Sequence, residues 1–510
     1  MEIIRNRHSD VVLECSANLH LLAREASMID TVIKGGTVVT PAGVGSWDNG
    51  FEGEKIAAVT MPGVLSTEGV RVIDVTGKIV VPGGVEAHAH AAANVQDGLP
   101  ELVSGTPNAG PEVHSLGAIW GGTTTVVDFT PVNNDGDLAE GVHDFMSVWK
   151  GQAYTDYTTH VIYRNSNTPD SIARFGELVS AGFPSVKIFT TDIRPPGTEG
   201  RTLTPGGRLE TGRLYDLMEQ VERHGGMLAV HGEDEELVMY NYLMAQQRDH
   251  WDWYNANLIH SKAVEDLAFR HVTRMAERTG AGMYFVHVTA KDGVDVIAEC
   301  RSNGQPVYGE VLTLALSFDA SRYREDDGMK YHTYPSLKGG EDNVSLWDGI
   351  MKSDLAFTAT DSSFTTYLDK IAGRNVENMR GGNIGIEIRM GVNYTEAVVK
   401  RGMSLERFAD VTSSNAAKIL GMYPQKGAIA VGSDADFAII DPSVKKALAM
   451  SDLHVRDYSP WEGWQVEGWP TTVILRGKVM IDQGQLLGDS NDGQMVLRKV
   501  DQSELQRPAV

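Results

Sequence analysis

The chain has 510 residues, of which 45 are basic and 68 acidic, and its formal net charge of −23 at pH 7 opposes binding to nucleic acid or to anionic membranes. No apolar run approaches the roughly 20 residues that a membrane span needs, and Met1–Arg5 lacks the apolar core of a signal peptide. Two cysteines, Cys15 and Cys300, cannot build a disulfide framework, so we expect a reducing compartment and a cytoplasmic protein. From the charge and the lack of a long apolar run, we expect neither nucleic acid nor a membrane as a partner.

Both ends of the chain carry short β-type runs. Residues 1–28 are interpreted as an N-terminal extension, and residues 489–510, which are polar, as a C-terminal tail or an oligomer arm. Residues 29–80 and 422–488 are predicted to form one small β-sandwich domain built from both chain ends. Its expected strands are Thr31–Ile33, Thr37–Val39, Val70–Ile73, Ala428–Val431, Asp436–Ile440 and Thr472–Val479.

Between these segments, residues 81–421 alternate short apolar strands with longer helix-like segments, as in repeated βα units. Eight strand candidates can be counted, and eight is the number that a (β/α)₈ TIM barrel requires. They are Ile79–His90, Thr123–Phe129, Tyr157–Tyr163, Ser185–Thr191, Gly226–Glu233, Ala281–Thr289, Pro306–Leu312 and Leu355–Ser363. Residues Ala263–Thr279 predict one outer helix, with Leu267, Ala268, His271, Val272 and Met275 on its inner face. The predicted fold class is α/β.

The first barrel strand ends in a His-x-His pattern. Residues two apart on a strand point to the same side, so His88 and His90 can offer two imidazoles to one metal ion. A lone pattern of this kind is more often solvent-exposed than a metal site, so further ligands are needed. In a barrel the chemistry gathers at the C-terminal ends of the strands. The candidates there are Lys187, His231, His287 and Asp361, on the fourth, fifth, sixth and eighth strands.

Each of these residues alone has a simpler structural interpretation. A histidine at a strand end is usually a hydrogen-bonding residue, a lysine between apolar residues usually extends its amine to solvent, and Asp361 before two serines would pass as a helix cap. Six such residues in this order on the expected strands favour a metal site instead.

Long ordered motifs accompany the candidate ligands. They are Gly121–Phe129, Ser414–Gly421, Lys426–Asp436, Asp457–Gly463 and Gly468–Pro470. With them, the chain from about residue 29 to about residue 488 resembles the dihydropyrimidinase and D-hydantoinase family of the amidohydrolase superfamily. Matches of this length are specific for the family and less specific for the substrate.

The resemblance implies a two-metal centre. His88, His90 and Asp361 would hold one ion, and His231 and His287 the other. Lys187 would bridge both ions as N6-carboxylysine, because a carbamate made with CO₂ is an anionic carboxylate whereas a lysine cation is a poor ligand. Zinc is the expected metal, and the same ligands also suit manganese, iron or cobalt.

The reaction implied is hydrolysis of a non-peptide carbon–nitrogen bond in a cyclic amide or imide of small size. A hydroxide shared by the two ions would attack the carbonyl, and Asp361 as general base would pass the proton to the leaving nitrogen. A homotetramer or homodimer is also implied. The alternatives are a superfamily hydrolase acting on an allantoin-like amide, an acyclic amide or a lactone, and a non-catalytic scaffold relative, against which the six retained ligands argue.

The positions that read the substrate depart from the family pattern. Asp192 stands where the family has a tyrosine that supports the oxyanion, Tyr334 replaces a serine, and Gly381 replaces an asparagine, with Asn383 nearby. A carboxylate cannot stabilise an oxyanion unless it is protonated, so the hydroxyl of Tyr334 is a candidate replacement donor. Asp192, Tyr334 and Asn383 are the predicted substrate contacts. The hypothesis is that the preferred substrate is not a plain hydantoin or dihydropyrimidine. The alternative is that neighbouring groups compensate for these replacements and the usual substrates still react.

Overall fold

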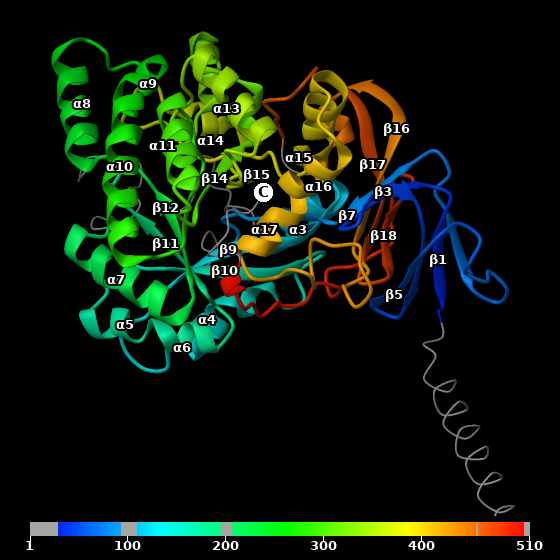
Figure 1. Cartoon of the computed structure of the whole chain (residues 1–510). Helices are drawn as coiled ribbons and strands as arrows, with labels where there is room; N and C mark the ends of the chain where they lie inside the picture. Colours follow the sequence, from blue (N-terminus) through cyan, green and yellow to red (C-terminus); the bar gives the residue numbers. More distant parts are fainter. Residues whose placement is uncertain (1–28, 93–109, 194, 196–206, 455–456, 504–510) are drawn as a thin grey trace, which may run out of the picture.

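A computed structural model of the chain describes residues 29–92, 110–193, 195, 207–454 and 457–503. A barrel of parallel strands surrounded by helices lies beside a smaller body of β-sheet (Figure 1). The smaller body contains strands from both chain ends, drawn in blue and in orange to red (Figure 1). The expected N-terminal extension, residues 1–28, lies outside the described residues.

Eight strands form the barrel, and each pairs in parallel with its neighbour in the sequence. They are β8 (Gly84–Glu86), β9 (Thr123–Pro131), β10 (Asp156–Ile162), β11 (Ser185–Phe189), β12 (Met227–His231), β13 (Met283–Phe285), β14 (Val307–Leu312) and β15 (Phe357–Ala359). Nearly every residue in these strands is buried, as expected of a parallel sheet covered on both faces. The predicted (β/α)₈ fold is confirmed.

A short bridge closes the barrel between its first and last strands. Ala89 pairs with Ser362 in parallel register. Here the amide of His90 donates to the carbonyl of Ser362 at 2.8 Å, and the amide of Ser362 donates to the carbonyl of His88 at 3.2 Å. The closure therefore places the His-x-His pattern beside Asp361.

Helices cover the outside of the barrel and its upper end (Figure 1). They are α3 (Pro111–Trp120), α4 (Leu138–Met146), α5 (Pro169–Ala173), α6 (Phe175–Ser180), α7 (Thr211–His224), α8 (Glu235–Gln247), α9 (Ala256–Ile259), α10 (Lys262–Thr279), α11 (Lys291–Ser302), α12 (Thr313–Ser317), α13 (Gly340–Lys352), α14 (Tyr367–Ala372), α15 (Arg389–Asn393), α16 (Leu405–Ala409) and α17 (Asn415–Ile419). Shorter 3₁₀ or π-helical turns are η1 (Ser147–Trp149), η2 (Trp253–Asn255), η3 (Ala320–Arg324), η4 (Gly328–Tyr331), η5 (Tyr394–Val399), η6 (Asp410–Ser414) and η7 (Met450–Asp452).

Helix α10 corresponds to the predicted outer helix, but its inner face is rotated from the expected one. Leu267 is 48% exposed and His271 is exposed, whereas Phe269 is buried. The ring of Phe269 stacks on Phe285 of β13 with centroids 3.5 Å apart. This contact with the barrel decides which face turns inward, and periodicity alone does not reveal it.

The smaller body is a sandwich of two sheets. One has the strand order β5-β4-β1-β6 and the other β19-β18-β17-β16-β7-β2-β3. The strands are β1 (Thr31–Lys34), β2 (Thr37–Thr40), β3 (Gly43–Ser46), β4 (Asp48–Glu52), β5 (Lys55–Thr60), β6 (Arg71–Asp74), β7 (Ile79–Pro82), β16 (Phe437–Ala447), β17 (Gln465–Leu475), β18 (Lys478–Asp482) and β19 (Gln485–Leu486). Buried side chains from both chain ends, including Ile33, Val80, Phe437 and Ile474, form its core.

Three of the expected strands differ in the structure. Ile79–His90 is divided, because β7 joins the sandwich and β8 joins the barrel. Thr472–Val479 contains a hairpin turn at Arg476–Gly477, where both residues have positive φ angles of 42° and 77°, as tight hairpins require. Ala428–Val431 was wrongly predicted as a strand, since it forms no ladder among the described residues.

The described part of the expected C-terminal tail, residues 489–503, packs against the barrel. The carbonyl of Tyr157 at the start of β10 accepts a hydrogen bond from the amide of Val496 at 2.8 Å. Arg498 is 3% exposed and donates to the backbone carbonyls of Thr159 on β10 and of Leu420 at the end of α17. Residues 504–510 lie outside the described part of the chain.

Candidate metal centre

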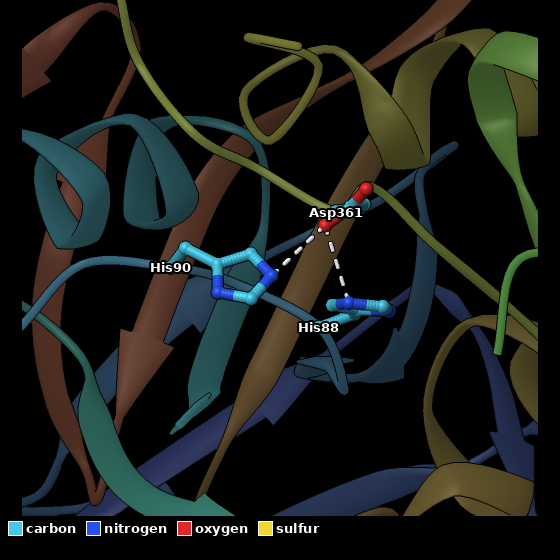
Figure 2. Close-up of side chains that lie close together, drawn as sticks. All are labelled: His88, His90 and Asp361. Carbon is cyan, nitrogen blue, oxygen red and sulfur yellow. Dashed lines mark ion pairs between the residues drawn. The ribbon is translucent and has the colours of Figure 1, made fainter. Parts of the chain in front are cut away.

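His88, His90 and Asp361 lie together where β8 and β15 end. The carboxylate oxygen Oδ1 of Asp361 lies 3.1 Å from Nε2 of His88 and 3.1 Å from Nε2 of His90 (Figure 2). Asp361 thus sits between the two imidazoles, and one donor atom of each residue lies within 4.8 Å of the other two. This geometry brings together three candidate ligands that could hold one divalent ion.

A second group lies next to the first. Nδ1 of His231, at the end of β12, is 2.9 Å from Nε2 of His287, which follows β13. The rings of His88 and His287 have centroids 5.5 Å apart, so the two groups adjoin. Lys187 of β11 is buried, and its amine lies 5.3 Å from the ring centre of Phe129. All six candidate ligands therefore project from the same end of the barrel.

Buried carboxylates hold the imidazoles of both groups. Glu310 of β14 accepts a hydrogen bond from Nδ1 of His88 at 2.8 Å and another from the amide of His287 at 3.0 Å. Glu233 accepts from Nε2 of His231 at 2.9 Å and from Nδ1 of His260 at 2.8 Å. These bonds orient the rings and leave Nε2 of His88 and Nδ1 of His231 turned toward the ligand positions.

A buried ion pair braces the backbone beneath the first group. Oε1 of Glu86 accepts from the amide of His88 at 3.1 Å and from the amide of Thr360 at 3.0 Å. Its other oxygen lies 3.2 Å from Nε of Arg389, and both side chains are fully buried. Glu86 therefore links the two strands that carry His88 and Asp361.

Two of the candidate ligands have uncommon backbone conformations. His287 has a φ of 41° and Asp361 a φ of 50°, in the left-handed region that residues other than glycine seldom adopt. Such conformations cost on the order of 1–3 kcal/mol each and cluster at functional sites. Here they turn both side chains toward the centre at the ends of their strands.

The electrostatics of the first group favour a positive charge. Burial works to lower the pKa of His88, but the carboxylates of Glu310 and Asp361 outweigh it and raise this pKa to about 9. Burial works to raise the pKa of Asp361, but His88 and His90 hold it well below its ordinary value. A protonated imidazole supplies the positive charge in the chain alone. A divalent ion would replace it, so the residues fit a metal.

The second group provides uncharged donors. Burial lowers the pKa of His231 and also that of His287, which favours the neutral imidazoles that bind metals. Burial also lowers the pKa of Lys187 to about 8, although Glu310 and Asp361 work in the opposite direction. The lower pKa increases the fraction of uncharged amine, which is the form that reacts with CO₂.

Comparison with known proteins identifies the family. The family model described as "Amidohydrolase family" matches residues 79–480. The chain belongs to the amidohydrolase family. A D-hydantoinase of Geobacillus stearothermophilus is 30% identical over 477 residues, which cover 92% of this chain and 96% of that protein. A D-hydantoinase of Rhizobium radiobacter is 30% identical over 484 residues, which cover 92% and 99%.

Solved structures agree with this assignment. The structure of a D-hydantoinase from Bacillus sp. AR9 superposes with a TM-score of 0.83 at 28% identity and covers 92% of this chain and 99% of that one. A dihydropyrimidinase from Brevibacillus agri NCHU1002 gives a TM-score of 0.82 at 28% identity, with 92% and 98% covered. The amidohydrolase family is metal-dependent, in agreement with the ligand groups described above. Within the described ranges, no helix combines the length and apolar character that crossing a membrane requires.

Two of the predicted substrate contacts in this amidohydrolase make hydrogen bonds to backbone groups. Oδ1 of Asp192 accepts from the amide of Arg208 at 2.9 Å. The amide side chain of Asn383 donates to the carbonyl of Thr360 and accepts from the amide of Gly385 at 3.0 Å. Both residues thus have structural roles in the loops that follow the strands.

Tyr334, the third predicted contact, lies in the wall of the centre. It packs against a cluster of apolar residues that includes Phe129 and Phe189. The ring of Phe129 stacks on that of His90 with centroids 4.6 Å apart, and the ring centroids of Phe189 and His231 are 5.2 Å apart. Tyr334 thus contacts the aromatic residues that pack on His90 and His231, and its contact with a substrate stays a prediction.

Sequence reasoning missed the carboxylates that hold the imidazoles. Glu310 is the one acidic residue in the otherwise apolar strand Val307–Leu312, and Glu233 follows His231 by two positions. A charged residue in a fully buried strand needs a partner, and that requirement was a usable signal.

Proposed function

We propose that this chain is a two-metal hydrolase that opens a cyclic amide or imide of the hydantoin or dihydropyrimidine type. The observation that carries the proposal is the position of Asp361 between His88 and His90, next to the pair of His231 and His287. The kinship with D-hydantoinases supports the substrate class.

In this proposal His88, His90 and Asp361 bind one ion, and His231 and His287 bind the other. Lys187, as N6-carboxylysine, would be the ligand that the two ions share. Zinc suits this mixture of imidazole and carboxylate ligands, and manganese, iron and cobalt suit it as well. The buried surroundings and lowered pKa of Lys187 agree with a carboxylated side chain.

The two ions would supply a water of lowered pKa and polarise the substrate carbonyl when bound. The chain's own residues then handle the proton. Oδ1 of Asp361 faces the imidazoles, whereas Oδ2 is 3.4 Å from the hydroxyl of Thr333 and is the oxygen left to take a proton. From there the proton passes to the nitrogen that leaves when the ring opens.

The test is turnover by protein of known metal content. Protein loaded with zinc or manganese is mixed with dihydrouracil and with 5-substituted hydantoins, and ring opening is followed by ultraviolet absorbance. We expect about two metal equivalents and loss of turnover after chelation. Protein with two equivalents that opens no ring would move the search to allantoin-like amides, acyclic amides and lactones. Protein that binds no metal would indicate a scaffold without catalytic activity.

Lys187→Ala tests the bridging ligand. We expect it to lose at least one metal equivalent and to lose turnover, because the carboxylate that would join the two ions is gone. Lys150→Ala, at an exposed lysine, is the matched control and should keep the metal content and the turnover of the wild type. Normal metal content and turnover in Lys187→Ala would refute the assignment of this lysine.

The quaternary structure and the compartment complete the proposal. A homodimer or homotetramer is proposed from the kinship with hydantoinases, and light scattering after size-exclusion chromatography tests it. A cytoplasmic location is proposed from the cysteine content, because two cysteines in 510 residues give no disulfide framework.

A further inference from the structure

Tyr334 occupies a confined position in the wall of the metal centre. Its ring makes edge contacts with His260 and His332, with centroids 5.0 and 4.5 Å away. On another side it meets the apolar cluster formed by Phe129, Ile162, Phe189 and Ile193. Because Phe129 and Phe189 contact imidazoles of both candidate ligand groups, they connect the tyrosine ring to the candidate metal centre.

Gly381 makes room for this ring. A Cβ atom at position 381 would lie 2.8 Å from Cε2 of Tyr334 and closer still to Cδ2, which real side chains do not tolerate. The glycine is not needed for a left-handed backbone, since Gly382 and not Gly381 has the positive φ. A glycine at 381 and a tyrosine at 334 are therefore one packing unit.

A buried lysine fixes the two segments that carry this unit. The amine of Lys370 donates to the carbonyl of His332 at 2.6 Å, to that of Arg380 at 2.8 Å and to that of Gly382. The first carbonyl lies two residues before Tyr334, and the other two flank Gly381. The ring consequently has little freedom to move aside for a ligand.

The hydroxyl of Tyr334 has a partner of its own. It donates to the carbonyl of Met379 at 3.3 Å, in the same loop as Gly381. A hydroxyl has one proton to donate, so a hydroxyl bonded in this way does not at the same time stabilise an oxyanion. The contribution of the residue to the site is then the volume of its ring.

We infer that Tyr334, held by Gly381 and Lys370, is a specificity-determining residue that excludes bulky ring substituents. The substrate class is a cyclic amide with a small substituent or none. This inference rests on the proposed function, because it concerns the same ring-opening site. A rigid side chain can exclude a group by volume only where its neighbours prevent it from yielding, and the contacts of Tyr334 meet that condition.

The experiment compares kcat/KM for hydantoin and for 5-phenylhydantoin in metal-loaded protein. In Tyr334→Ala the ratio of the bulky to the small substrate should rise about 10- to 200-fold, the usual range for a change in pocket volume. Tyr334→Phe keeps the ring and should keep the wild-type ratio. Tyr240→Ala, at a 55% exposed tyrosine on α8, is the matched control and should leave the ratio unchanged.

Packing of the unit is tested separately from turnover. Gly381→Ala should lower the melting temperature, because its methyl group clashes with the ring of Tyr334. The double variant Tyr334→Ala/Gly381→Ala lacks that ring and should regain most of the lost melting temperature. Gly212→Ala on α7 is the control, since nothing lies within 4 Å of its added methyl group. Equal losses in the single and double variants would show that the two positions are not one unit.

The results separate the two proposals. A ratio unchanged in Tyr334→Ala, in protein that opens hydantoin and holds its metals, would overturn the inference and leave the proposed function intact. A hundredfold loss of kcat on both substrates in Tyr334→Phe would show that the hydroxyl acts, contrary to the inference. If fully metallated wild-type protein opens neither substrate, the proposed function fails and the inference fails with it.

Discussion

Glu310 is the residue through which the two ligand groups are most directly connected, and Glu310→Gln tests that connection. Its Oε1 accepts from the imidazole of His88 at 2.8 Å and from the backbone of His287 at 3.0 Å. Oε2 has no hydrogen-bond partner among the described residues, so the amide nitrogen of glutamine can take its place without breaking a bond. We expect the variant to fold and to bind metal more weakly.

The size of the expected loss of metal affinity follows from the type of hydrogen bond that Glu310 makes. Residues that hold a metal-binding histidine typically change metal affinity by about 10- to 100-fold when replaced. This corresponds to about 1.4–2.7 kcal/mol of binding free energy. Both hydrogen bonds to Glu310 weaken when the charge is removed. They hold His88 and His287, the proposed ligands of different ions, so the loss of affinity should lie in the upper half of that range.

The assay is competition for zinc with a chelator of known affinity, followed by measurement of the metal retained per chain. Glu236→Gln, at an exposed position on α8, is the matched control. The melting temperature of the metal-free protein shows whether folding itself has changed. Wild-type metal affinity in a folded Glu310→Gln variant would refute the idea that this carboxylate orients the ligands.

Two further predictions concern stability. The amine of Lys426 lies 2.5–2.9 Å from three buried carboxylates. They are Asp156, Asp434 and Asp436. Lys426→Met removes the cation that these three carboxylates share and leaves Asp156 with Arg476 and Asp434 with Lys55. It should cost about 3–5 kcal/mol, seen calorimetrically as a lower melting temperature. Arg498→Met should cost about 1–3 kcal/mol for each carbonyl that loses its donor, with metal content preserved. A melting temperature equal to that of the wild type would contradict either prediction.

The barrel could be predicted from the sequence because its signal is repeated. Eight apolar runs separated by helix-length segments leave few other architectures, and an error at one boundary does not change the count. The boundaries themselves depend on which sheet a residue joins. Ile79–His90 was counted as one strand, yet its first part pairs with β16 in the sandwich and its second part with β9 in the barrel. Pro82 and two glycines stand at the division, but they do not indicate which sheet each part joins.

The candidate ligands could be predicted because the fold gives the strand ends a common location. Their order along the chain was sufficient to group His88, His231 and Asp361 before any distance was known. The predicted substrate contacts have no such common location, and they stay predictions. Asp192 and Asn383 are polar residues in the expected loops, but their side chains bind the backbone. A sequence does not distinguish a polar side chain that supports a loop from one that meets a ligand.

The metal centre and the substrate wall are built from different parts of the chain. The candidate ligands and the carboxylates behind them lie on the barrel strands or within four residues of their ends, where neighbouring strands fix the backbone. Tyr334 and Gly381 lie in the loops after β14 and β15, and Lys370 joins those loops to each other. A substitution at Tyr334 or Gly381 therefore needs compensating substitutions only in these loops and not in the barrel strands. Under the proposed function, this separation would let the substrate-facing loops change while the proposed ligand set stays complete.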